Sequence, residues 1–323
     1  MGRGPGAAMN AGRGGKSGGR PKGGGPKGAR GAKKAARGPG KQASRGKGQP
    51  KQPRRRDGQR GTTPIRPLDQ ENRKSSLGGD QVEGRHAVRE LLMAGTRRTR
   101  EVILAGDLDP APILDDIIDL ADEQKVTLRE IARSKFESMT RTDGSQGVLA
   151  MAAPLRATEL EDLMEPDIDG APPFLLMLDG ITDPHNLGAI LRTAECCGVS
   201  GIILPRHRAA HVTPTVAKTA AGAVEHLRMA VVGGLPSAMK TLSGRGIWTV
   251  GLDAGGERSI FDLPMADEPV ALVLGAEGPG LSRLVRERCD TVASIPMLGV
   301  LDSLNVSNAA AVACYEVTRR RAQ

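Results

Sequence analysis

The residues best suited to chemistry lie in three loops, and the first loop sets an asparagine and an arginine at the start of a helix. In "DPHNLGAILR", Asp183 and Pro184 form a turn, and Asn186 is a candidate N-cap for a helix that runs to Cys197. Arg192 follows among apolar residues, a setting in which a guanidinium needs an anionic partner. The loop therefore predicts either a capped helix with one salt-bridged arginine or an arginine that binds an anionic group of a substrate.

The second loop, "LVLGAEGPGLSRLV", follows an apolar run and surrounds a carboxylate with glycines. Glu277 lies among Gly275, Gly278 and Gly280, and Ser282 is placed to start the next helix. Glycines allow the backbone to approach a ligand closely. The pattern indicates a ligand-binding loop, although Glu277 read alone is equally compatible with surface charge.

The third loop, "IPMLGVLDSLNVSNAAA", leads into the last helix, expected over 304–320. It concentrates hydrogen-bonding side chains at the helix start: Ser303, Asn305, Ser307 and Asn308. Capping a helix uses one or two such groups. The excess predicts that this helix start faces a ligand.

The elements that must position these loops form two α/β units. A small unit alternates strands at 101–104, 126–131 and 148–152 with helices. A larger unit has strands at 174–178, 201–204, 227–231, 246–251, 270–274 and 291–295, again with helices between them. Apolar runs such as "VALVLG" are typical of strands buried on both faces of a parallel sheet. Ligands of open α/β sheets bind at the carboxyl ends of the strands, where all three loops begin.

Missing motifs and composition exclude several classes of protein. There is no GxxxxGK[ST] and no GxGxxG after a first strand, which argues against a P-loop enzyme and an ordinary Rossmann dinucleotide or methyltransferase fold. The four cysteines have no CxxC spacing, so we expect no metal. No apolar run is long enough for a signal peptide or a membrane span. We expect a cytoplasmic protein.

Charge is divided unevenly along the chain. Residues 1–78 hold 21 Lys or Arg, three Asp or Glu, 20 of the 43 Gly and no aromatic residue, a net charge of +18, whereas residues 79–323 carry −9. Such a segment buries too little apolar surface to fold, so we expect a disordered tail. It would attract polyanions without base specificity, or serve only to keep the protein in solution.

The three loops, in this order, resemble the three signature motifs of the SpoU (TrmH-type) branch of the SPOUT RNA 2′-O-ribose methyltransferases. The matching stretches are "DPHNLGAILR", "GAEGPGL", and "IPM" followed by "SLNVSNA". Asp183 stands where the family often has Asn. The resemblance covers residues 79–323 and implies an α/β fold with a carboxyl-terminal trefoil knot in residues 172–323. Before it come a ribosomal-protein-like substrate-binding domain in 79–154 and a linker in 155–171, with the tail in 1–78.

The resemblance also implies a reaction and a set of site residues. The expected cofactor is S-adenosyl-L-methionine, and the expected substrate is a ribose 2′-hydroxyl of a guanosine in large-subunit (23S) ribosomal RNA. The partners would be that RNA or a pre-ribosomal particle, and a second copy in a homodimer. The cofactor would contact Gly275, Ile295 and Leu304, with Ala276, Pro296 and Met297 nearby. The expected catalytic residues are Asn186, Arg192, Glu277, Ser303 and Asn305.

Arg192 would stabilise charge on the substrate rather than take its proton, because a guanidinium has a pKa above 12. Asn186, Glu277, Ser303 and Asn305 would orient it and the ribose. Two alternatives remain open at this point. One is a guanosine 2′-O-methyltransferase acting on transfer RNA, and the other is a ribosome- or RNA-binding protein without catalysis on the same fold.

Overall fold

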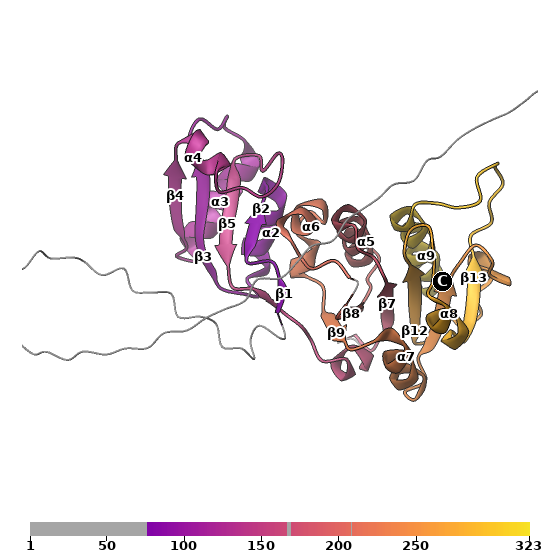
Figure 1. Cartoon of the computed structure of the whole chain (residues 1–323). Helices are drawn as coiled ribbons and strands as arrows, with labels where there is room; N and C mark the ends of the chain where they lie inside the picture. The colour runs from indigo at the N-terminus through magenta and orange to yellow at the C-terminus, as the bar shows by residue number, and fades with distance from the viewer. Residues whose placement is uncertain (1–75, 167–168, 208) are drawn as a thin grey trace, which may run out of the picture. The chain divides into compact units, whose positions relative to one another are not determined.

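The computed structural model describes residues 76–166, 169–207 and 209–323 (Figure 1). The expected basic tail lies outside these residues except for its last three. Those three form strand β1 (Ser76–Gly78), which pairs antiparallel with β6 (Leu155–Arg156). Leu77 is 3% exposed and packs in the main core. Residues 76–78, which the sequence assigned to the tail, therefore belong to the folded structure.

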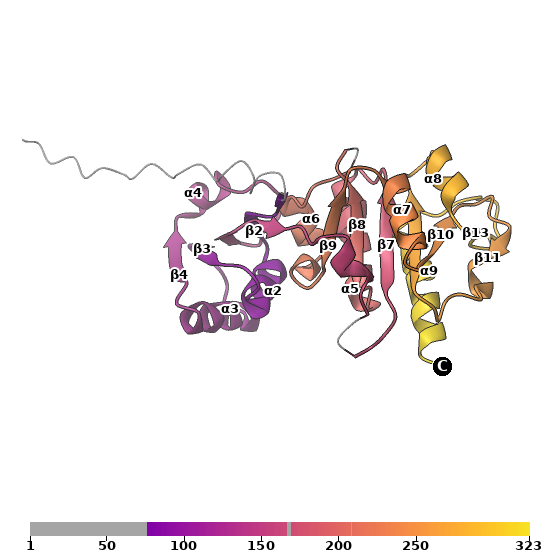
Figure 2. The ribbon, with the colours of Figure 1, turned by 90° about the horizontal axis from the view of Figure 1, so that it is seen from below.

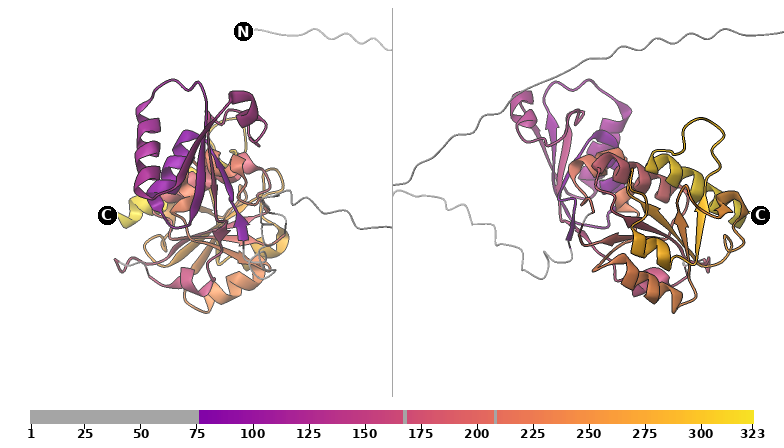
Figure 3. Two further views of the ribbon diagram at one scale, coloured as in Figure 1. Left: turned by 90° about the vertical axis from the view of Figure 1, so that its left-hand side faces the viewer. Right: turned by 45° about the vertical axis from the view of Figure 1, so that its right-hand side comes forward.

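The small lobe is a four-stranded sheet with helices on both faces. Its strands run in the order β2 (Gln81–Glu83), β5 (Val148–Ala152), β3 (Thr99–Ala105) and β4 (Thr127–Ile131). Helices α2 (Arg85–Ala94) and α3 (Pro112–Glu123) share one face, and the short α4 (Arg133–Glu137) covers the other (Figure 3). Helix α2 buries Val88, Leu91 and Leu92 as one stripe, and it ends at Gly95 with a left-handed φ of 57°.

The large lobe is built on a seven-stranded, all-parallel sheet. In spatial order its strands are β11 (Arg258–Ser259), β13 (Thr291–Ser294), β10 (Trp248–Leu252), β12 (Val270–Gly275), β7 (Phe174–Asp179), β8 (Gly201–Pro205) and β9 (Met229–Val232). Every residue of β12 is buried, because helices cover both faces of the sheet. The α/β class and the parallel sheet expected from the sequence are confirmed.

Helices divide between the two faces of this sheet (Figures 1 and 2). Helices α5 (Pro184–Cys196), α6 (Pro214–Thr219) and α9 (Val306–Arg321) pack on one face, and α7 (Leu235–Ser243) and α8 (Arg283–Arg288) pack on the other. Alternation along β7 follows this division: Leu176 joins the first core and Met177 the second. In the described part of the chain, no helix combines the length and apolar character needed to cross a membrane.

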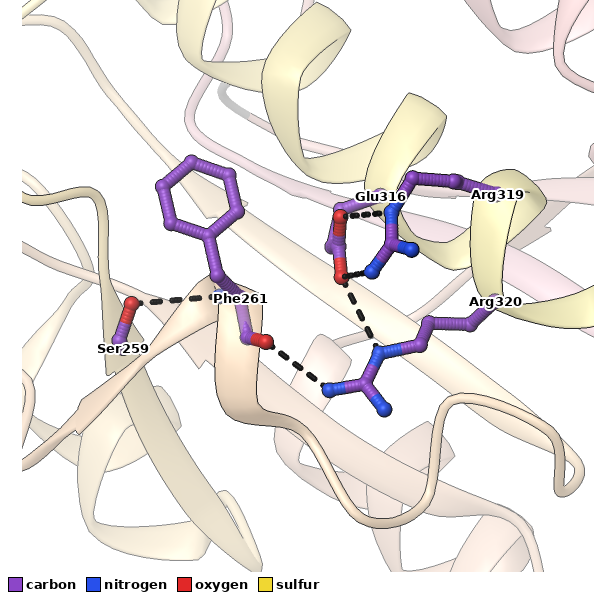
Figure 4. Close-up of polar contacts among 5 residues, drawn as sticks. All are labelled: Ser259, Phe261, Glu316, Arg319 and Arg320. Atoms are coloured by element: carbon purple, nitrogen blue, oxygen red, sulfur yellow. Dashed lines mark hydrogen bonds and ion pairs between the residues drawn. The ribbon is translucent and has the colours of Figure 1, made fainter.

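The end of α9 is fastened to the 3-10 helix η3 (Ile260–Asp262). Glu316, 6% exposed, accepts hydrogen bonds from Arg319 Nε (2.9 Å), Arg319 Nη2 (2.8 Å) and Arg320 Nε (3.2 Å). Arg320 Nη2 also donates to the carbonyl of Phe261 at 2.9 Å (Figure 4). Hydrogen bonds from Arg319 hold the pKa of Glu316 below its ordinary value.

The segment expected as a linker packs on the large lobe. Residues 155–171 contain β6 and the 3-10 helix η1 (Glu161–Met164). Leu163 is fully buried in the second core, where Gly201 leaves room for its methyl groups. The apolar residues of "ELEDLME" explain this packing, which the acidic composition of the segment obscured.

Candidate active site

A cavity of about 470 Å³ opens at the carboxyl ends of the parallel strands. The loops after β10, β12 and β13 and the first turn of α9 line it. Of the residues expected to contact a cofactor, five line this cavity: Gly275, Ala276, Ile295, Met297 and Leu304. Pro296 lies between two lining residues without lining the cavity itself. The structure thus brings together two loops that are about 20 residues apart in the sequence.

The loop after β12 is a tight turn whose shape explains its glycines. Ala276 and Gly280 exchange backbone hydrogen bonds of 3.0 and 2.9 Å, and Gly278 and Gly280 have φ angles of 84° and 67°. A Cβ on Gly275 would lie 2.2 Å from the carbonyl carbon of Gly280 and 2.3 Å from the amide nitrogen of Leu281. The close approach of a ligand to these glycines stays a prediction, and the structure adds that Gly275 leaves room for the loop's own backbone.

Asn186 joins the first and third loops to the second through its amide. Its Nδ2 donates to Glu277 Oε2 at 3.0 Å, and its Oδ1 accepts from Asn305 Nδ2 at 3.0 Å. Asn305 Oδ1 in turn accepts from the backbone amide of Ser307 at 2.9 Å and from its hydroxyl at 2.6 Å. Three of the five expected catalytic residues therefore form one polar chain at the edge of the cavity.

The sequence suggested that Asn186 caps α5, but the structure shows a different N-cap. The helix begins at Pro184, and its N-cap is Asp183, whose carboxylate accepts from the amide of His185 at 3.0 Å. Asn186 lies in the first turn and is 7% exposed. Because a buried amide needs partners for both ends, its side chain is fixed between Glu277 and Asn305.

Arg192 lies elsewhere on the same helix. Its sequence neighbours Ile190, Leu191 and Ala194 are buried, but Arg192 itself is exposed. The apolar setting expected from the sequence is therefore wrong, because α5 buries only one face and Arg192 points from the other. Among the described residues, the guanidinium has no hydrogen-bond or ion-pair partner, and it does not line the cavity.

Ser303 lines the cavity but is not part of the polar chain. Its hydroxyl donates to Asp302 Oδ1 at 3.2 Å, within the same loop. Asn305 caps α9, which fits the expected helix start. Sequence reasoning missed the end of β10 and the loop after it, where Leu252, Asp253 and Ala254 also line the cavity. An acidic residue directly after a buried strand was the available signal.

Ties between the loops hold this edge of the sheet together. Asp179, the last residue of β7, accepts from the amide of Ser282 at 2.7 Å, which connects the first loop to the end of the second. Asp253 accepts from the amide of Gly255 at 2.9 Å and pairs with Arg286 at 3.7 Å. Within the described ranges, no cluster of three or more His, Cys, Asp or Glu is placed to hold a metal ion.

Family models and a curated relative match nearly all of the described chain. Residues 173–315 match the SpoU rRNA methylase family, and residues 81–158 match the model for RNA 2′-O ribose methyltransferase substrate binding. A protein from Bacillus subtilis (strain 168), named as a TrmH family tRNA/rRNA methyltransferase (YacO), is 40% identical over 243 residues, which cover 75% of this chain and 96% of that protein. The chain belongs to the SpoU methylase family.

A second relative and solved structures agree with this family. A protein of Staphylococcus saprophyticus that also bears a TrmH family name is 37% identical over 74% of this chain and 95% of its own length. The SpoU methyltransferase AviRb from Streptomyces viridochromogenes superposes with a TM-score of 0.63 at 25% identity, over 77% of this chain and 91% of AviRb. AviRb has also been solved in complex with its cofactor AdoMet, at a TM-score of 0.60 and 25% identity over 75% of this chain and 90% of AviRb. The SPOUT fold inferred from the motifs is therefore confirmed.

Proposed function

We propose that this member of the SpoU family methylates the ribose 2′-hydroxyl of a guanosine in large-subunit (23S) ribosomal RNA, in the cytoplasm. The family supplies the coarser part of this statement, which is 2′-O-methylation of RNA with S-adenosylmethionine as cofactor. Ribosomal RNA as substrate, guanosine as nucleotide and the large subunit as target are the proposal.

The observation that favours a methyltransferase over a protein that only binds RNA is the polar chain through Asn186. A protein that only binds RNA gains nothing from a buried amide that joins Glu277 and Asn305 beside a cavity. An unpaired buried amide costs free energy, and Asn186 avoids this cost because both ends of its side chain are bonded, to Glu277 and Asn305, which are themselves exposed. The arrangement is suited to holding a ribose in one orientation, and correct positioning supplies a large share of the rate in group transfer.

The cavity fits an adenosine-bearing cofactor. Leu252, Ile295 and Leu304 offer apolar surface, and the loop of residues 275–280 adds backbone polar groups other than those of Ala276 and Gly280, which bond each other. Apolar walls with a few fixed polar groups are what small-molecule sites use. S-adenosylmethionine bound there would supply an electrophilic methyl group.

Arg192 is proposed to bind the substrate rather than the cofactor. Its exposed guanidinium is free to contact a phosphate and to stabilise negative charge that develops on the 2′-oxygen. Glu277, also exposed, and Ser303 would contact the ribose from the opposite loops.

We also propose a homodimer, in which the exposed face of α5 that carries Arg192 would adjoin the second copy.

Ribose methylation maps of ribosomal and transfer RNA test the proposal. A strain that lacks the protein is expected to lose one 2′-O-methylguanosine from 23S RNA, and the wild-type gene is expected to restore it. Loss of a mark from transfer RNA instead would favour the tRNA enzyme. Unchanged maps in both RNA classes would leave the non-catalytic alternative.

A further inference from the structure

The small lobe is held to the large lobe at the neck where the chain enters and leaves it. The described residues of both lobes belong to one compact unit. Gly79 precedes the first strand of the small lobe's sheet, and Ala153 follows its last strand. Arg97, from the small lobe, donates through Nη1 to the carbonyls of both Gly79 and Ala153, the latter at 2.6 Å. One side chain is thus hydrogen-bonded to both chain segments of the neck.

The same arginine also binds the large lobe. Arg97 Nε and Nη2 donate to the two carboxylate oxygens of Glu225 at 2.8 and 2.6 Å, a bidentate pair. Glu225 belongs to the 3-10 helix η2 (Ala223–Glu225), and the side chains of Arg97 and Glu225 are 7% and 0% exposed. Buried ion pairs contribute little net stability, because desolvation offsets the attraction, and a role in specifying one arrangement is the best-supported alternative.

Close backbone packing surrounds this ion pair. A Cβ on Gly222, which has a φ of 88°, would lie 2.4 Å from Glu90 Cβ and 3.3 Å from Ala87 Cα on α2. Lys218 of α6 donates to the carbonyl of Asp143 in the small lobe, and Glu90 is 3.1 Å from His226 Nε2. These contacts extend along α2 and the loop before β5, so the interface is wider than the neck.

The part of the large lobe that contacts the small lobe, helix α6, also packs against α5, the helix that carries Asn186 and Arg192. A Cβ on Gly188 of α5 would lie 2.6 Å from Thr219 Cβ and 2.9 Å from the carbonyl oxygen of Val216 on α6. Helix α6 therefore touches the small lobe on one side and the site helix on the other. A continuous packed path connects the two.

We propose that the Arg97–Glu225 pair is a positioning device that fixes the small lobe, and the RNA bound to it, at a set reach from the active site. The inference rests on the proposed function in taking RNA as the substrate of this site. The fixed distance between the small lobe and the active site then selects the nucleotide: an RNA bound to the lobe presents to the site only the nucleotide at that distance. Arg97 and Glu225 touch neither the cavity nor the polar chain.

The test replaces both charged side chains by amides, Arg97→Gln with Glu225→Gln, so that no lone charge stays buried. We call this double substitution the neck variant. The matched control is Arg129→Gln with Glu101→Gln, which removes an Arg–Glu pair of 2.9 Å, partly exposed, from within the small lobe. The substrate is unmodified 23S RNA with S-adenosylmethionine. The neck variant is expected to lose about tenfold in kcat/KM for RNA and to spread methyl groups over additional nucleotides, with cofactor affinity unchanged. The control is expected to match wild type within twofold.

A second measurement keeps the inference separate from the proposed function. Hydrogen exchange in the full chain without RNA should be faster in α2 and η2 of the neck variant, and unchanged in the control. If wild type methylates no ribosomal RNA, the proposed function fails while exchange still tests the fixed neck. Wild-type exchange in the neck variant would overturn the inference, and so would a single methylated nucleotide with wild-type kcat/KM.

Discussion

Amide side chains organise the candidate site at the scale of single residues. Asn186 offers a donor to Glu277 and an acceptor to Asn305, and Asn305 passes the connection to the first turn of α9. Arg192 stands apart on the exposed face of the same helix. The site therefore divides into a polar chain that joins three loops and one exposed arginine, which we propose binds the substrate.

Substitutions of Arg192 test its assignment to charge stabilisation. Arg192→Lys should keep a little activity and Arg192→Ala almost none, because lysine retains the charge but loses the planar fork. Loss of one transition-state contact costs about 10²–10³ in rate. Single-turnover methylation and calorimetric titration with S-adenosylmethionine separate the two effects.

Cofactor affinity should be nearly unchanged in both Arg192 variants, because Arg192 does not line the cavity. Arg206→Ala is a suitable control, as it removes another exposed arginine of the large lobe. Full activity in Arg192→Ala would refute the assignment. Loss of cofactor binding would place Arg192 at the cofactor.

Residue types and their order in the sequence were enough to select Asn186, Glu277 and Asn305 as site residues, but not to predict which of them contact one another. Loops that follow parallel strands meet at one edge, so the sequence could place them together. It could not show that Asn186 lies inside the helix with both ends of its amide bonded, because that depends on partners 91 and 119 positions away. The exposure of Arg192 was equally hidden, since apolar neighbours in sequence occupy a different face of a helix.

At the scale of elements, the turn after β12 depends on a residue without a side chain at position 275. Gly275→Ala places a Cβ against the backbone of Gly280 and Leu281. The turn must shift to make room for it, and the shift would strain its two backbone hydrogen bonds. We expect a loss of about 1–3 kcal/mol in the free energy of unfolding and at least about tenfold weaker cofactor binding. Urea denaturation and calorimetry measure the two.

Gly299→Ala is the matched control for Gly275→Ala. Gly299 lies in the loop after β13, and a Cβ there would meet no atom within 4 Å. Its stability and cofactor affinity should match wild type. Equal behaviour of the two alanine variants would remove the steric argument for Gly275.

The attachment of α9 to η3 should depend on pH through Glu316. Its pKa is lowered in the fold by hydrogen bonds from Arg319, so its contribution to stability is present above the unfolded pKa, about 4.3, and is lost as pH falls through the folded pKa. Glu316→Gln should lower the free energy of unfolding by about 1–3 kcal/mol at pH 7 and by less at pH 3.

Glu287→Gln controls for the loss of a carboxylate on an exposed helix. Glu287 pairs with Arg283 at 2.9 Å, and its side chain is 53% exposed. Such surface pairs contribute about 0–1 kcal/mol. A Glu316→Gln variant whose deficit is the same at both pH values would contradict the pKa argument.

Element types were largely predictable and some boundaries were not. Buried apolar runs identified β7 and β12 within one residue, because strands covered on both faces have no polar alternation to misread. The sequence did not predict strands β1 and β6, since a strand of two or three residues shows no periodicity and these two pair only through a long-range contact. The packing of Leu163 was hidden for the same reason.

At the scale of the whole molecule, net charge distinguishes the amino-terminal segment, residues 1–78, from the rest of the chain. All 21 Lys and Arg of residues 1–78 lie within 1–75, so a truncated chain that begins at Ser76 loses them and keeps β1. We expect it to bind S-adenosylmethionine as wild type does and RNA more weakly at low salt. If the segment contacts as few as about three phosphates of single-stranded RNA, the slope of log affinity against log salt becomes about 2 units shallower. Equal slopes for the two chains would show that it makes no phosphate contacts.

Transfer of a radioactive methyl group to unmodified 23S RNA tests the central claim most directly. Purified protein is incubated with labelled S-adenosylmethionine and the RNA, which is then digested with alkali. A 2′-O-methyl group blocks cleavage at its own nucleotide, so the account predicts label in alkali-stable dinucleotides that begin with guanosine, and none with Arg192→Ala. Label in mononucleotides would show base methylation, and no label in 23S RNA from an active preparation would contradict the proposed substrate.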